Sequence, residues 1–515
     1  MKNQQKTNKG NKRNYIICQF FIFLFLFICT SLVWERLNFG GVDLASIYFT
    51  LTMPLEGASS KYIISYLLKG PLLALGLLLI EMIFFKVFIK YISPIIVKKT
   101  FIKEGFFRLT TKKTVIFSIC LFLLSFGVLN YFLNVSEFVK NQIVTSKFIE
   151  NNYSNPSETK LVFPKKKMNI VHIYLESGES TLQDKQNGGE FNINYIPEMT
   201  ALEKNNISFS NNNAMKGAHV TEGGGFTTGG MVAQECGLPM KTDMQNQDNI
   251  NKAFSKANYF LPGATSIGDI LYKEGYNNFY ACDQNWAFGG IKSYYEQHGN
   301  YKHLDYWQAV KEGKISEDYF EWWGFEDEKL YKYAKEKVLA LANKNKPFNF
   351  TMATMDTHQL DGFVCDLCKK EHEDQYGNVW SCASRQVYDF VEWLKKQPFY
   401  NNTVIVITGD HCSMAPTFFK KHDIDPKQRF VYNTFINSKI KPQKEKNRRF
   451  TTLDIYPTML AAMGVKIEGN KLGLGVNLFS DKKTLSEEYG YEYLDKELKK
   501  KSKFYNDNIM NPENK

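Results

Sequence analysis

The sequence predicts N-terminal transmembrane α-helices followed by an α/β domain with a mostly parallel central sheet flanked by helices. Apolar runs of membrane-spanning length occupy the first quarter of the chain. From residue 166, short β-branched and aromatic runs alternate with helical patterns. At 515 residues the chain is also too long for one ordinary domain. We divide it into a basic N-terminus (1–14), a transmembrane region (15–133), a juxtamembrane linker (134–165), a globular domain (166–486) and a charged tail (487–515). We expect the lysine-rich tail to be a frayed, solvated helix.

The transmembrane region contains three apolar runs, each able to supply roughly 20 residues, the length that crosses a hydrocarbon core. They are Tyr15–Trp34, a stretch within Tyr62–Val97, and Thr114–Leu133. No small-residue cleavage site follows the first run, so we interpret it as an anchor and not as a signal peptide. Segment 43–54 is about half the required length. We expect it to be interfacial or re-entrant.

Positive charge is concentrated beside these runs. The net charge is +11, and segments 1–15 and 98–113 hold eleven basic residues against one acid, Glu104. The rest of the chain is almost neutral, so no nucleic-acid partner is expected. The positive-inside rule places both basic segments in the cytoplasm. Three spans then put everything after residue 133 outside, whereas a fourth span at 43–54 would reverse that orientation.

The globular domain should contain several strands joined by helices. The expected strands are Asn169–Leu175, Ile207–Phe209, Asn278–Ala281, Phe348–Thr354, Thr403–Thr408 and Arg429–Ile436. Glu328–Ala342 and Arg385–Lys396 have apolar residues at helical spacing. Such alternation is typical of a mostly parallel sheet covered by helices. In these sheets ligands bind beyond the carboxyl ends of the strands.

Three of the expected strands end in side chains that suit a metal ion. Glu176 follows the first strand, Asp356 and His358 follow Phe348–Thr354, and Asp410 and His411 follow Thr403–Thr408. Taken singly, Glu176 or His358 is more simply an ordinary polar loop residue. Together they favour a divalent-metal site, because mixed oxygen and nitrogen ligands suit Zn²⁺ or Mn²⁺.

A glycine-rich segment supplies hydroxyl groups. Residues 217–237 (GAHVTEGGGFTTGGMVAQECG) contain seven glycines, which allow sharp turns and a close approach to a ligand. Glycines alone predict only a flexible loop. Thr221, Thr227 and Thr228 lie in the same segment. A hydroxyl on a divalent cation loses its proton more readily and becomes a nucleophile, and the residues by themselves leave all three threonines open.

Six cysteines lie outside the apolar runs: Cys236, Cys282, Cys365, Cys368, Cys382 and Cys412. An even number suits an oxidising compartment, although the sequence does not choose the pairs. Cys365 and Cys368 form a CxxC motif, which is half of a common zinc motif. No second CxxC completes it, so a structural zinc site is not expected.

Segments from about residue 170 to 480 resemble a known family in the same order along the chain. They are IYLES, FTTGGMVAQECGLP, IGDIL, EQHGN, WWGFEDE, MDTHQLDGF, SCASRQ, VIVITGDH, TTLDIYPTML and LGLGVNLFS. These segments are similar to the membrane-anchored headgroup transferases of the alkaline phosphatase and sulfatase superfamily. That group includes lipoteichoic acid synthases, phosphoethanolamine transferases and phosphoglycerol transferases, of which the phosphoglycerol transferase I group looks most similar. Ordered agreement of this kind is more specific than any single motif.

The resemblance implies one divalent metal ion, Zn²⁺ or Mn²⁺ with Mg²⁺ as the alternative, held by Glu176, Asp410, His411 and Thr227. It makes Thr227 the nucleophile as well. It also implies that His358 contacts the phosphate or acts as an acid toward the leaving group. The long glycine segment departs from the family pattern, so Thr228 and Thr221 stay as alternatives.

Further roles follow from the resemblance alone. Asp327 and Asp356 are expected near the substrate, beside His358. The implied disulfides are Cys368–Cys382 and, as a second suggestion, Cys236–Cys282. Sulfate ester hydrolysis is not expected, because the CxPxR or SxPxR segment of sulfatases does not occur in this sequence.

The implied protein is a multi-pass enzyme of the bacterial inner membrane with its catalytic domain on the periplasmic or extracellular side. It would move phosphoglycerol from phosphatidylglycerol to an envelope glycan through a phosphothreonine and release diacylglycerol. The main alternative is phosphoethanolamine transfer to lipopolysaccharide or another glycan. Polyglycerolphosphate synthesis and a non-catalytic envelope sensor or scaffold rank lower.

Overall fold

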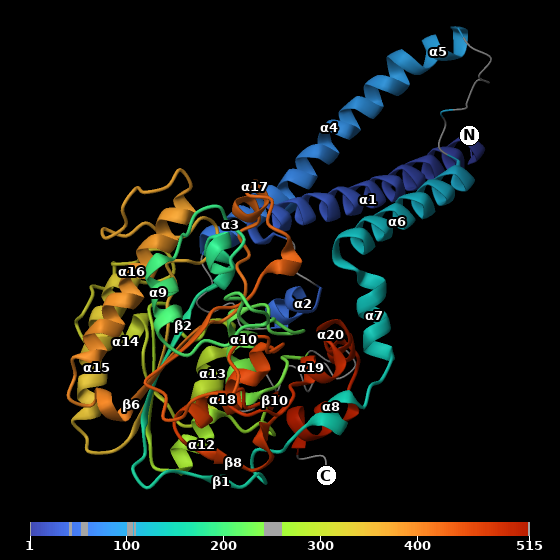
Figure 1. Cartoon of the computed structure of the whole chain (residues 1–515). Coiled ribbons are helices and arrows are strands. Elements are labelled where there is room, and N and C mark those ends of the chain that lie inside the picture. Colours follow the sequence, from blue (N-terminus) through green and yellow to red (C-terminus); the bar gives the residue numbers. More distant parts are fainter. Residues whose placement is uncertain are drawn as a thin grey trace. The chain divides into compact units, whose positions relative to one another are not determined.

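A computed structural model describes residues 2–40, 44–52, 60–99, 107, 110–241 and 260–512. The chain divides into two compact units (Figure 1). We call Met1–Leu44 with Ala58–Phe138 the membrane unit. Ala45–Gly57 with Val139–Lys515 is the globular unit.

The membrane unit contains three long helical stretches. The first is α1 (Lys2–Phe39) and the third is α6 (Thr111–Leu133). The second runs continuously through α3 (Ser60–Leu67), η1 (Leu68–Leu72), α4 (Leu73–Val87), η2 (Phe88–Ile92) and α5 (Ser93–Lys99). Lys12–Phe39, Lys61–Lys99 and Thr111–Leu133 are long and apolar enough to cross a membrane. The three predicted apolar runs therefore lie in membrane-length helices.

Polar groups of the membrane unit face its neighbouring helices, whereas many apolar side chains point outward. The Thr30 hydroxyl donates to the Gly70 carbonyl over 3.1 Å, and the Trp34 indole donates to the Ser65 hydroxyl over 3.0 Å. Ile80 and Leu123 are at least 60% exposed. An outer surface of this kind suits lipid, because contiguous apolar area in water marks an interaction surface.

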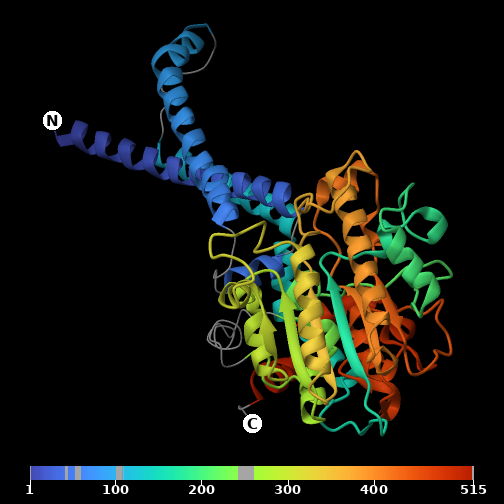
Figure 2. The same ribbon diagram turned by 90° about the vertical axis from the view of Figure 1, so that its left-hand side faces the viewer.

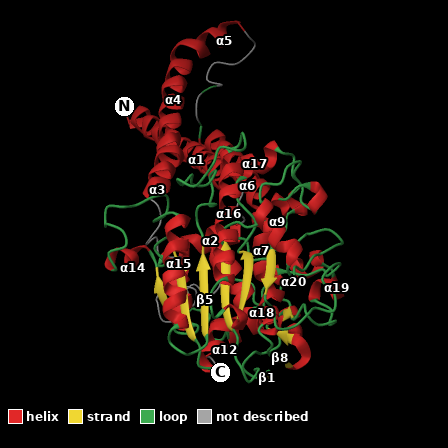
Figure 3. Ribbon diagram, turned by 60° about the vertical axis from the view of Figure 1, so that its left-hand side comes forward, coloured by secondary structure: helices red, strands yellow, loops and turns green. Residues whose placement is uncertain are grey.

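The globular unit is built on a six-stranded sheet with the order β4-β3-β5-β2-β6-β7 (Figure 3). The strands are β2 (Asn169–Leu175), β3 (Asn277–Cys282), β4 (Lys302–Leu304), β5 (Phe348–Ala353), β6 (Thr403–Gly409) and β7 (Asn433–Ile436). All pairs are parallel except β6 with β7. Every residue of β2, β5 and β6 is buried, as expected for parallel strands covered on both faces. The predicted fold class is confirmed.

Helices cover both faces of the sheet. Side chains of β2 alternate, with Val171 and Ile173 in one core cluster and Tyr174 in another. The first cluster includes residues of α9 (Pro197–Asn205), α14 (Tyr306–Lys311), α15 (Asp327–Ala342), α16 (Gln375–Lys395) and α17 (Pro416–Lys421). Residues of α10 (Thr227–Cys236), α12 (Ile267–Lys273), α13 (Ile291–Gln297) and α18 (Ile455–Ala462) belong to the clusters opposite. Figure 2 shows α15, in yellow, and α16, in orange, alongside the strands.

Short elements complete the globular unit. They are β1 (Leu161–Val162), β8 (Lys466–Ile467), β9 (Lys471–Leu472), β10 (Gly475–Val476), and the 3₁₀ turns η3 (Ser180–Leu182), η4 (Lys185–Asn187), η7 (Phe288–Gly290), η8 (Tyr400–Asn402), η9 (Pro426–Gln428), η10 (Thr452–Asp454) and η11 (Glu468–Asn470). β1 pairs with β8 and β9 with β10, both antiparallel.

Some predicted boundaries differ from the structure. Ile207–Phe209 is not a strand, because only Ile207 pairs, in an isolated bridge with Phe435. The predicted strand Arg429–Ile436 shortens to β7, since Val431 bridges instead to Glu179 and Ala218. The three-residue β4 was not predicted. The expected helix Arg385–Lys396 begins ten residues earlier, at Gln375.

The second half of the predicted linker and the predicted tail pack in the globular unit. The linker contains α7 (Val135–Ile143) and α8 (Phe148–Asn152); the C-terminal segment contains α19 (Leu485–Tyr489), α20 (Tyr491–Lys499), α21 (Lys503–Tyr505) and η12 (Asn506–Met510). Ile149 lies in one core cluster with Leu494 and Leu498. Leu494 and Leu498 are one helical turn apart, so α20 buries one face. The expectation of a solvated tail is therefore wrong.

The described part of segment 43–54 is α2 (Leu44–Thr52), a helix of nine residues. This length is too short to cross a bilayer. Its Tyr48 side chain packs against the core cluster that contains Phe148 and Leu494. Residues 43, 53 and 54 lie outside the described residues.

Candidate functional site

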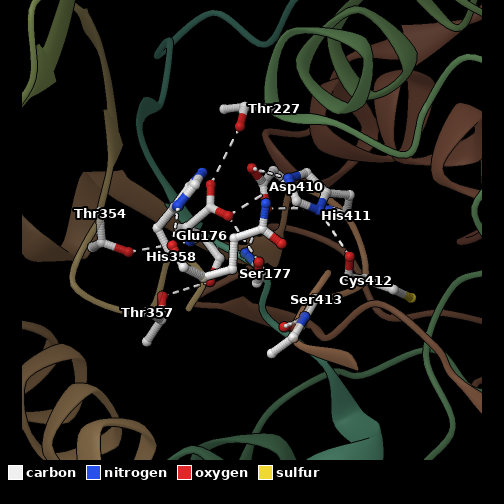
Figure 4. Close-up of polar contacts among 12 residues, drawn as sticks. Glu176, Ser177, Thr227, Thr354, Thr357, His358, Asp410, His411, Cys412 and Ser413 are labelled. Carbon is white, nitrogen blue, oxygen red and sulfur yellow. Dashed lines mark hydrogen bonds and ion pairs between the residues drawn. The ribbon is translucent and has the colours of Figure 1, made fainter. Parts of the chain in front are cut away.

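Three predicted side chains meet at the carboxyl edge of the sheet. One ligand atom each from Glu176, Asp410 and His411 lies within 4.8 Å of the others (Figure 4). All three residues are at most 2% exposed. They converge because β2 and β6 are adjacent parallel strands whose carboxyl ends lie side by side. We call this group the Glu176 cluster.

The His411 ring turns a lone pair toward the two carboxylates. Its Nδ1 lies 2.9 Å from the Cys412 carbonyl oxygen, which only accepts, so Nδ1 carries the proton. In the neutral ring Nε2 is then an acceptor, 3.4 Å from Asp410 Oδ2 and 3.6 Å from Glu176 Oε1. Among the described residues, neither His411 Nε2 nor Asp410 Oδ2 has a hydrogen-bond partner. Acceptors that converge without a donor fit a bound cation.

Neighbouring groups fix the carboxylates in place. The backbone amides of Ser177 and His411 both donate to Asp410 Oδ1 over 2.8 Å. The Ser177 hydroxyl donates to Glu176 Oε1 over 2.7 Å. Asp410 therefore keeps Oδ2 for a cation while donors orient Oδ1, and the Ser177 hydroxyl orients the Glu176 carboxylate. The sequence did not predict a role for Ser177. The only indication of one was its position directly after Glu176.

The charges of the Glu176 cluster are costly without a cation. Burial and the nearby Glu176 carboxylate raise the pKa of Asp410 to about 7. Burial lowers the pKa of His411, but the carboxylates of Asp410 and Glu176 more than offset this and raise it. Without a cation, a proton on Asp410 relieves the repulsion between two carboxylates, and a proton on His411 is favoured by their negative charge. A divalent cation would neutralise the same charges, and the donor set fits Zn²⁺ or Mn²⁺.

Of the three loop threonines, Thr227 lies beside this cluster. Its hydroxyl donates to Glu176 Oε2 over 3.2 Å (Figure 4). The Thr228 hydroxyl donates instead to the Gly289 carbonyl over 2.7 Å, and Thr221 is buried. Thr227 is also the first residue of α10, and the amino end of a helix favours an anion such as phosphate.

Glycines allow α10 to approach the sheet closely. A Cβ atom on Gly230 would lie 2.3 Å from the Asp410 carbonyl oxygen. A Cβ atom on Gly409, at the end of β6, would lie 1.9 Å from the Gly178 carbonyl oxygen, so the loop after β2 also passes close to β6. The Gln234 side chain donates to the Gly409 carbonyl over 2.8 Å and ties α10 to β6. Part of the glycine content thus serves backbone contact, which places Thr227 beside Glu176.

His358 is a half-buried, neutral imidazole near the cluster (Figure 4). Its Nδ1 donates to the Gln359 carbonyl over 2.8 Å, which leaves Nε2 as the acceptor. The ring meets the Trp323 ring edge-on, with centroids 4.8 Å apart. Burial lowers the pKa of His358 to about 4. At neutral pH the ring is therefore unprotonated, with the lone pair of Nε2 available.

Asp327 and Asp356 lie in a second group of carboxylates together with Asp283. All three are at most 2% exposed, as are the residues of the Glu176 cluster. The place of Asp327 and Asp356 near a substrate stays a prediction. Asp327 accepts hydrogen bonds from the Met355 and Asp356 amides over 2.8 and 3.3 Å. Asp327 therefore supports the turn that leads to His358. We call Asp283, Asp327 and Asp356 the Asp283 cluster.

All nine cysteines are free thiols, so neither predicted disulfide is formed. The Cys236 sulfur lies 3.3 Å from the Tyr294 hydroxyl, and the Cys282 thiol donates to the Gln284 carbonyl. Cys368 and Cys382 lie near each other, but in a group of three with Cys365.

Comparison with known families places the domain. The sulfatase family profile matches residues 168–465, more than half of the chain and all six strands of the central sheet. The chain belongs to the sulfatase family. Both the Glu176 cluster and Thr227 fall within the matched part.

Several relatives and solved structures are similar to this sulfatase-family chain. Proteins named phosphoglycerol transferase I from Salmonella typhimurium and Salmonella typhi are 29% identical over 330 residues, 63% of this chain and 40% of theirs. The chain thus matches less than half the length of these relatives. An alkaline phosphatase superfamily protein from Vibrio parahaemolyticus (17% identity, TM-score 0.49) covers 69% of this chain, with 80% of its own length matched. The lipooligosaccharide phosphoethanolamine transferase A from Neisseria meningitidis (14%, TM-score 0.49) covers 87%, with 84% of its own length matched.

Proposed function

We propose that this chain is a membrane-anchored, metal-dependent phosphotransferase. It moves a phospholipid headgroup, phosphoglycerol from phosphatidylglycerol, to an envelope glycan through a phosphothreonine at Thr227. The observation that carries the proposal is the Thr227 hydroxyl, which lies at the amino end of α10 and 3.2 Å from a carboxylate of the Glu176 cluster. The name of the relatives, phosphoglycerol transferase I, supports the choice of headgroup.

A divalent ion held by Glu176, Asp410, His411 and Thr227 would lower the pKa of the Thr227 hydroxyl and neutralise phosphate charge. The Thr227 hydroxyl gives up its proton as Oγ1 forms a bond to phosphorus, and the bond from phosphorus to the diacylglycerol oxygen breaks. The departing oxygen takes up a proton and diacylglycerol is released. The amide groups at the start of α10 face the charge that develops on the phosphoryl oxygens.

The second half of the reaction transfers the headgroup. An acceptor hydroxyl attacks phosphorus, its proton passes to a base, and the bond to Thr227 Oγ1 breaks, after which Oγ1 takes up a proton and the Thr227 hydroxyl is restored. His358 is suited to take that proton, because its ring is neutral and its Nε2 lone pair is free of the Gln359 contact. A covalent intermediate divides one difficult displacement into two easier ones, and the same residues can serve both steps.

The membrane unit supports a lipid donor. Its three membrane-length helices would confine the chain to the surface on which the donor lies. Confinement raises the effective concentration of enzyme and lipid for each other. Basic residues at 1–15 and 98–113 favour a bacterial inner-membrane protein with the globular unit on the periplasmic or extracellular side. A membrane-impermeant protease added to intact spheroplasts should cleave the globular unit; complete protection would contradict this orientation.

The test uses the full-length protein in liposomes with fluorescent phosphatidylglycerol or phosphatidylethanolamine, and measures diacylglycerol release. We expect chelator-sensitive release from phosphatidylglycerol that is lost in Thr227→Ala and kept in Thr228→Ala, a matched control one residue away. In the absence of an acceptor, mass spectrometry should detect the headgroup covalently bound to Thr227. Adding the glycan acceptor should transfer the headgroup from Thr227 to the glycan. Release from phosphatidylethanolamine alone would favour phosphoethanolamine transfer. Release that survives both chelation and Thr227→Ala would contradict the mechanism.

A further inference from the structure

We propose that Cys365, Cys368 and Cys382 form a second metal site, a thiolate site suited to Zn²⁺. It would fasten the loop 359–374 to α16. The site is distinct from the Glu176 cluster in both residues and ligand type. Sequence spacing could not indicate it, because only two of the three sulfurs belong to a CxxC motif and the third comes from a helix.

The sulfur spacing suits a metal ion. Cys365 Sγ lies 3.5 Å from Cys368 Sγ and 3.8 Å from Cys382 Sγ, and the three sulfurs are within 4.8 Å of one another. With Zn–S bonds of about 2.3 Å, two sulfurs of a tetrahedral site lie about 3.8 Å apart. One ion can thus contact all three sulfurs with little movement, and the fourth position is left for water.

The backbone presents the thiols toward one point. Cys365 and Cys368 flank a tight turn in which the Cys368 amide donates to the Cys365 carbonyl over 3.0 Å. Cys382 lies within α16 and, like Cys365, is buried. Cys368 is partly exposed, which gives an ion a route from solvent. A turn and a helix that are separate in sequence would be joined by the ion.

The surroundings favour negatively charged sulfur. Gln386 Nε2, one turn along α16 from Cys382, lies 3.5 Å from Cys382 Sγ and 3.8 Å from Cys365 Sγ. Arg385 on the same helix binds Glu371 through Nη1, while its buried Nη2 has no partner among the described residues. Three thiolates and one Zn²⁺ sum to a single negative charge, which a nearby guanidinium offsets. Amide donors to ligand sulfur are typical outer-shell support for a metal.

The ion would also constrain the loop that follows His358. This loop is held at its start by the Phe363 amide, which donates to the Asp356 carbonyl over 2.7 Å. Near its end the Glu371 and His372 amides both donate to Asn378 Oδ1. Between them the cysteines supply the link to α16. Binding exchanges three thiol protons for one Zn²⁺, with no change of oxidation state.

Cobalt provides a probe that does not depend on catalysis. Reduced, metal-free full-length protein is titrated with Co²⁺, and sulfur-to-cobalt charge-transfer absorption is recorded in the near ultraviolet. We expect the band in the wild type and in Asp410→Asn, which removes a ligand of the Glu176 cluster. Cys368→Ser should lose it, and Cys236→Ala, which removes another buried thiol of the globular unit, should keep it. Loss in Asp410→Asn with retention in Cys368→Ser would overturn the proposal.

A second measurement needs no substitution. Zn²⁺ should protect Cys365, Cys368 and Cys382 from alkylation together, and a chelator should restore their reactivity, as read by mass spectrometry of peptides. Equal alkylation with and without Zn²⁺ would overturn the site. So would a disulfide between two of the three cysteines in protein isolated without reductant and free of zinc. Because neither readout involves diacylglycerol, failure here is distinguishable from failure of the proposed function.

Discussion

Two groups of buried carboxylates lie at the carboxyl edge of the same sheet, and they differ in what surrounds them. The Glu176 cluster combines two carboxylates with a histidine lone pair, and Thr227 lies beside it. The Asp283 cluster consists of three carboxylates that follow β3, begin α15 and follow β5. Burial is nearly the same in both, so burial alone does not identify a functional site.

The difference lies in how each cluster is neutralised. In the Asp283 cluster, Asp327 already accepts two backbone hydrogen bonds. Neither oxygen of Asp283 has a donor among the described residues, but a proton on Asp283 makes that carboxyl a donor to Asp327. Burial and the charge of Asp327 raise the pKa of Asp283, which favours this shared proton. We infer that protons stabilise the Asp283 cluster and a cation stabilises the Glu176 cluster.

Removing one charge from each cluster is the most direct way to break this comparison. Glu176→Gln should abolish metal binding to its cluster and lower the rate of diacylglycerol release. A metal supplies several kcal/mol of transition-state stabilisation, equivalent to about three orders of magnitude in rate. Asp283→Asn should keep the metal and lose less than about tenfold in rate, equivalent to about 1.4 kcal/mol.

Metal content by elemental analysis and initial rates on the same samples check this prediction. A Cys368→Ser background removes the proposed thiolate site from the metal count. If Asp283→Asn loses as much metal as Glu176→Gln, the distinction between the two clusters fails.

The next largest effect should come from the position of α10, which only the Glu176 cluster needs. In Gly230→Ala the new Cβ would lie 2.3 Å from the Asp410 carbonyl oxygen, so α10 must shift. A displacement of about 1 Å at a reacting group costs about 100-fold in rate. Gly225→Ala is the matched control, because a Cβ there meets no atom within 4 Å. Rates of diacylglycerol release and melting temperatures of both variants test this prediction. Equal rates in Gly230→Ala and Gly225→Ala would show that the position of α10 does not control the position of Thr227.

The Glu176 cluster was within reach of sequence reasoning for a physical reason. Glu176, Asp410 and His411 follow long apolar runs that are strands in almost any context, and parallel strands end at one edge. Thr227 could be chosen only by resemblance, because Thr221 and Thr228 in the same segment carry the same hydroxyl. The structure separates them by the Thr228 contact with Gly289.

The Asp283 cluster should make stability depend on pH. Burial raises the pKa of Asp327 to about 6 and those of Asp283 and Asp356 well above the usual value. Unfolded, these groups titrate near 3.9, so between about 4 and 6 the folded state binds more protons than the unfolded state. The free energy of unfolding must therefore fall as pH rises through this range, by on the order of 1.4 kcal/mol per unit of pKa difference.

Denaturant unfolding of full-length wild type and Asp283→Asn across this pH range measures the effect. The variant should lose less stability with rising pH, because one buried proton no longer has to be released. Asp389→Asn serves as a control for a charge change on α16 outside both clusters. Parallel pH profiles for wild type and Asp283→Asn would exclude proton sharing.

The parts that sequence reasoning missed depend on contacts between distant segments. The charged composition of residues 487–515 suggested a solvated tail, yet Leu494 and Leu498 are fully or almost fully buried. Only two apolar positions on one face of α20 signalled this. Likewise, Asp283 lies far along the chain from Asp327 and Asp356, and Cys382 lies on α16 whereas Cys365 and Cys368 lie in the loop before it. Local sequence patterns predict which residues of a strand are buried, but they do not predict which helix packs against that strand.

The smallest effect should come from this C-terminal segment, which reaches the glycine-rich segment before Thr227. The Tyr491 hydroxyl donates to the Val220 carbonyl over 2.7 Å, and its ring stacks on His219 with centroids 4.1 Å apart. Tyr491→Phe removes one hydrogen bond, worth about 1 kcal/mol. We expect a rate loss of a few-fold, with metal binding unchanged. Tyr493→Phe, on a half-exposed ring of the same helix, is the control.

Rates and metal affinity measured together separate two roles for α20. If Tyr491→Phe lowers stability without changing the rate, α20 stabilises the core but does not position Thr227. If the rate falls while the pH dependence of the free energy of unfolding stays the same, α20 acts on the Glu176 cluster and not on the Asp283 cluster. That outcome would sharpen the comparison between the two clusters. It would mean that α20 helps to position Thr227 beside the Glu176 cluster and has no effect on the protonation of the Asp283 cluster.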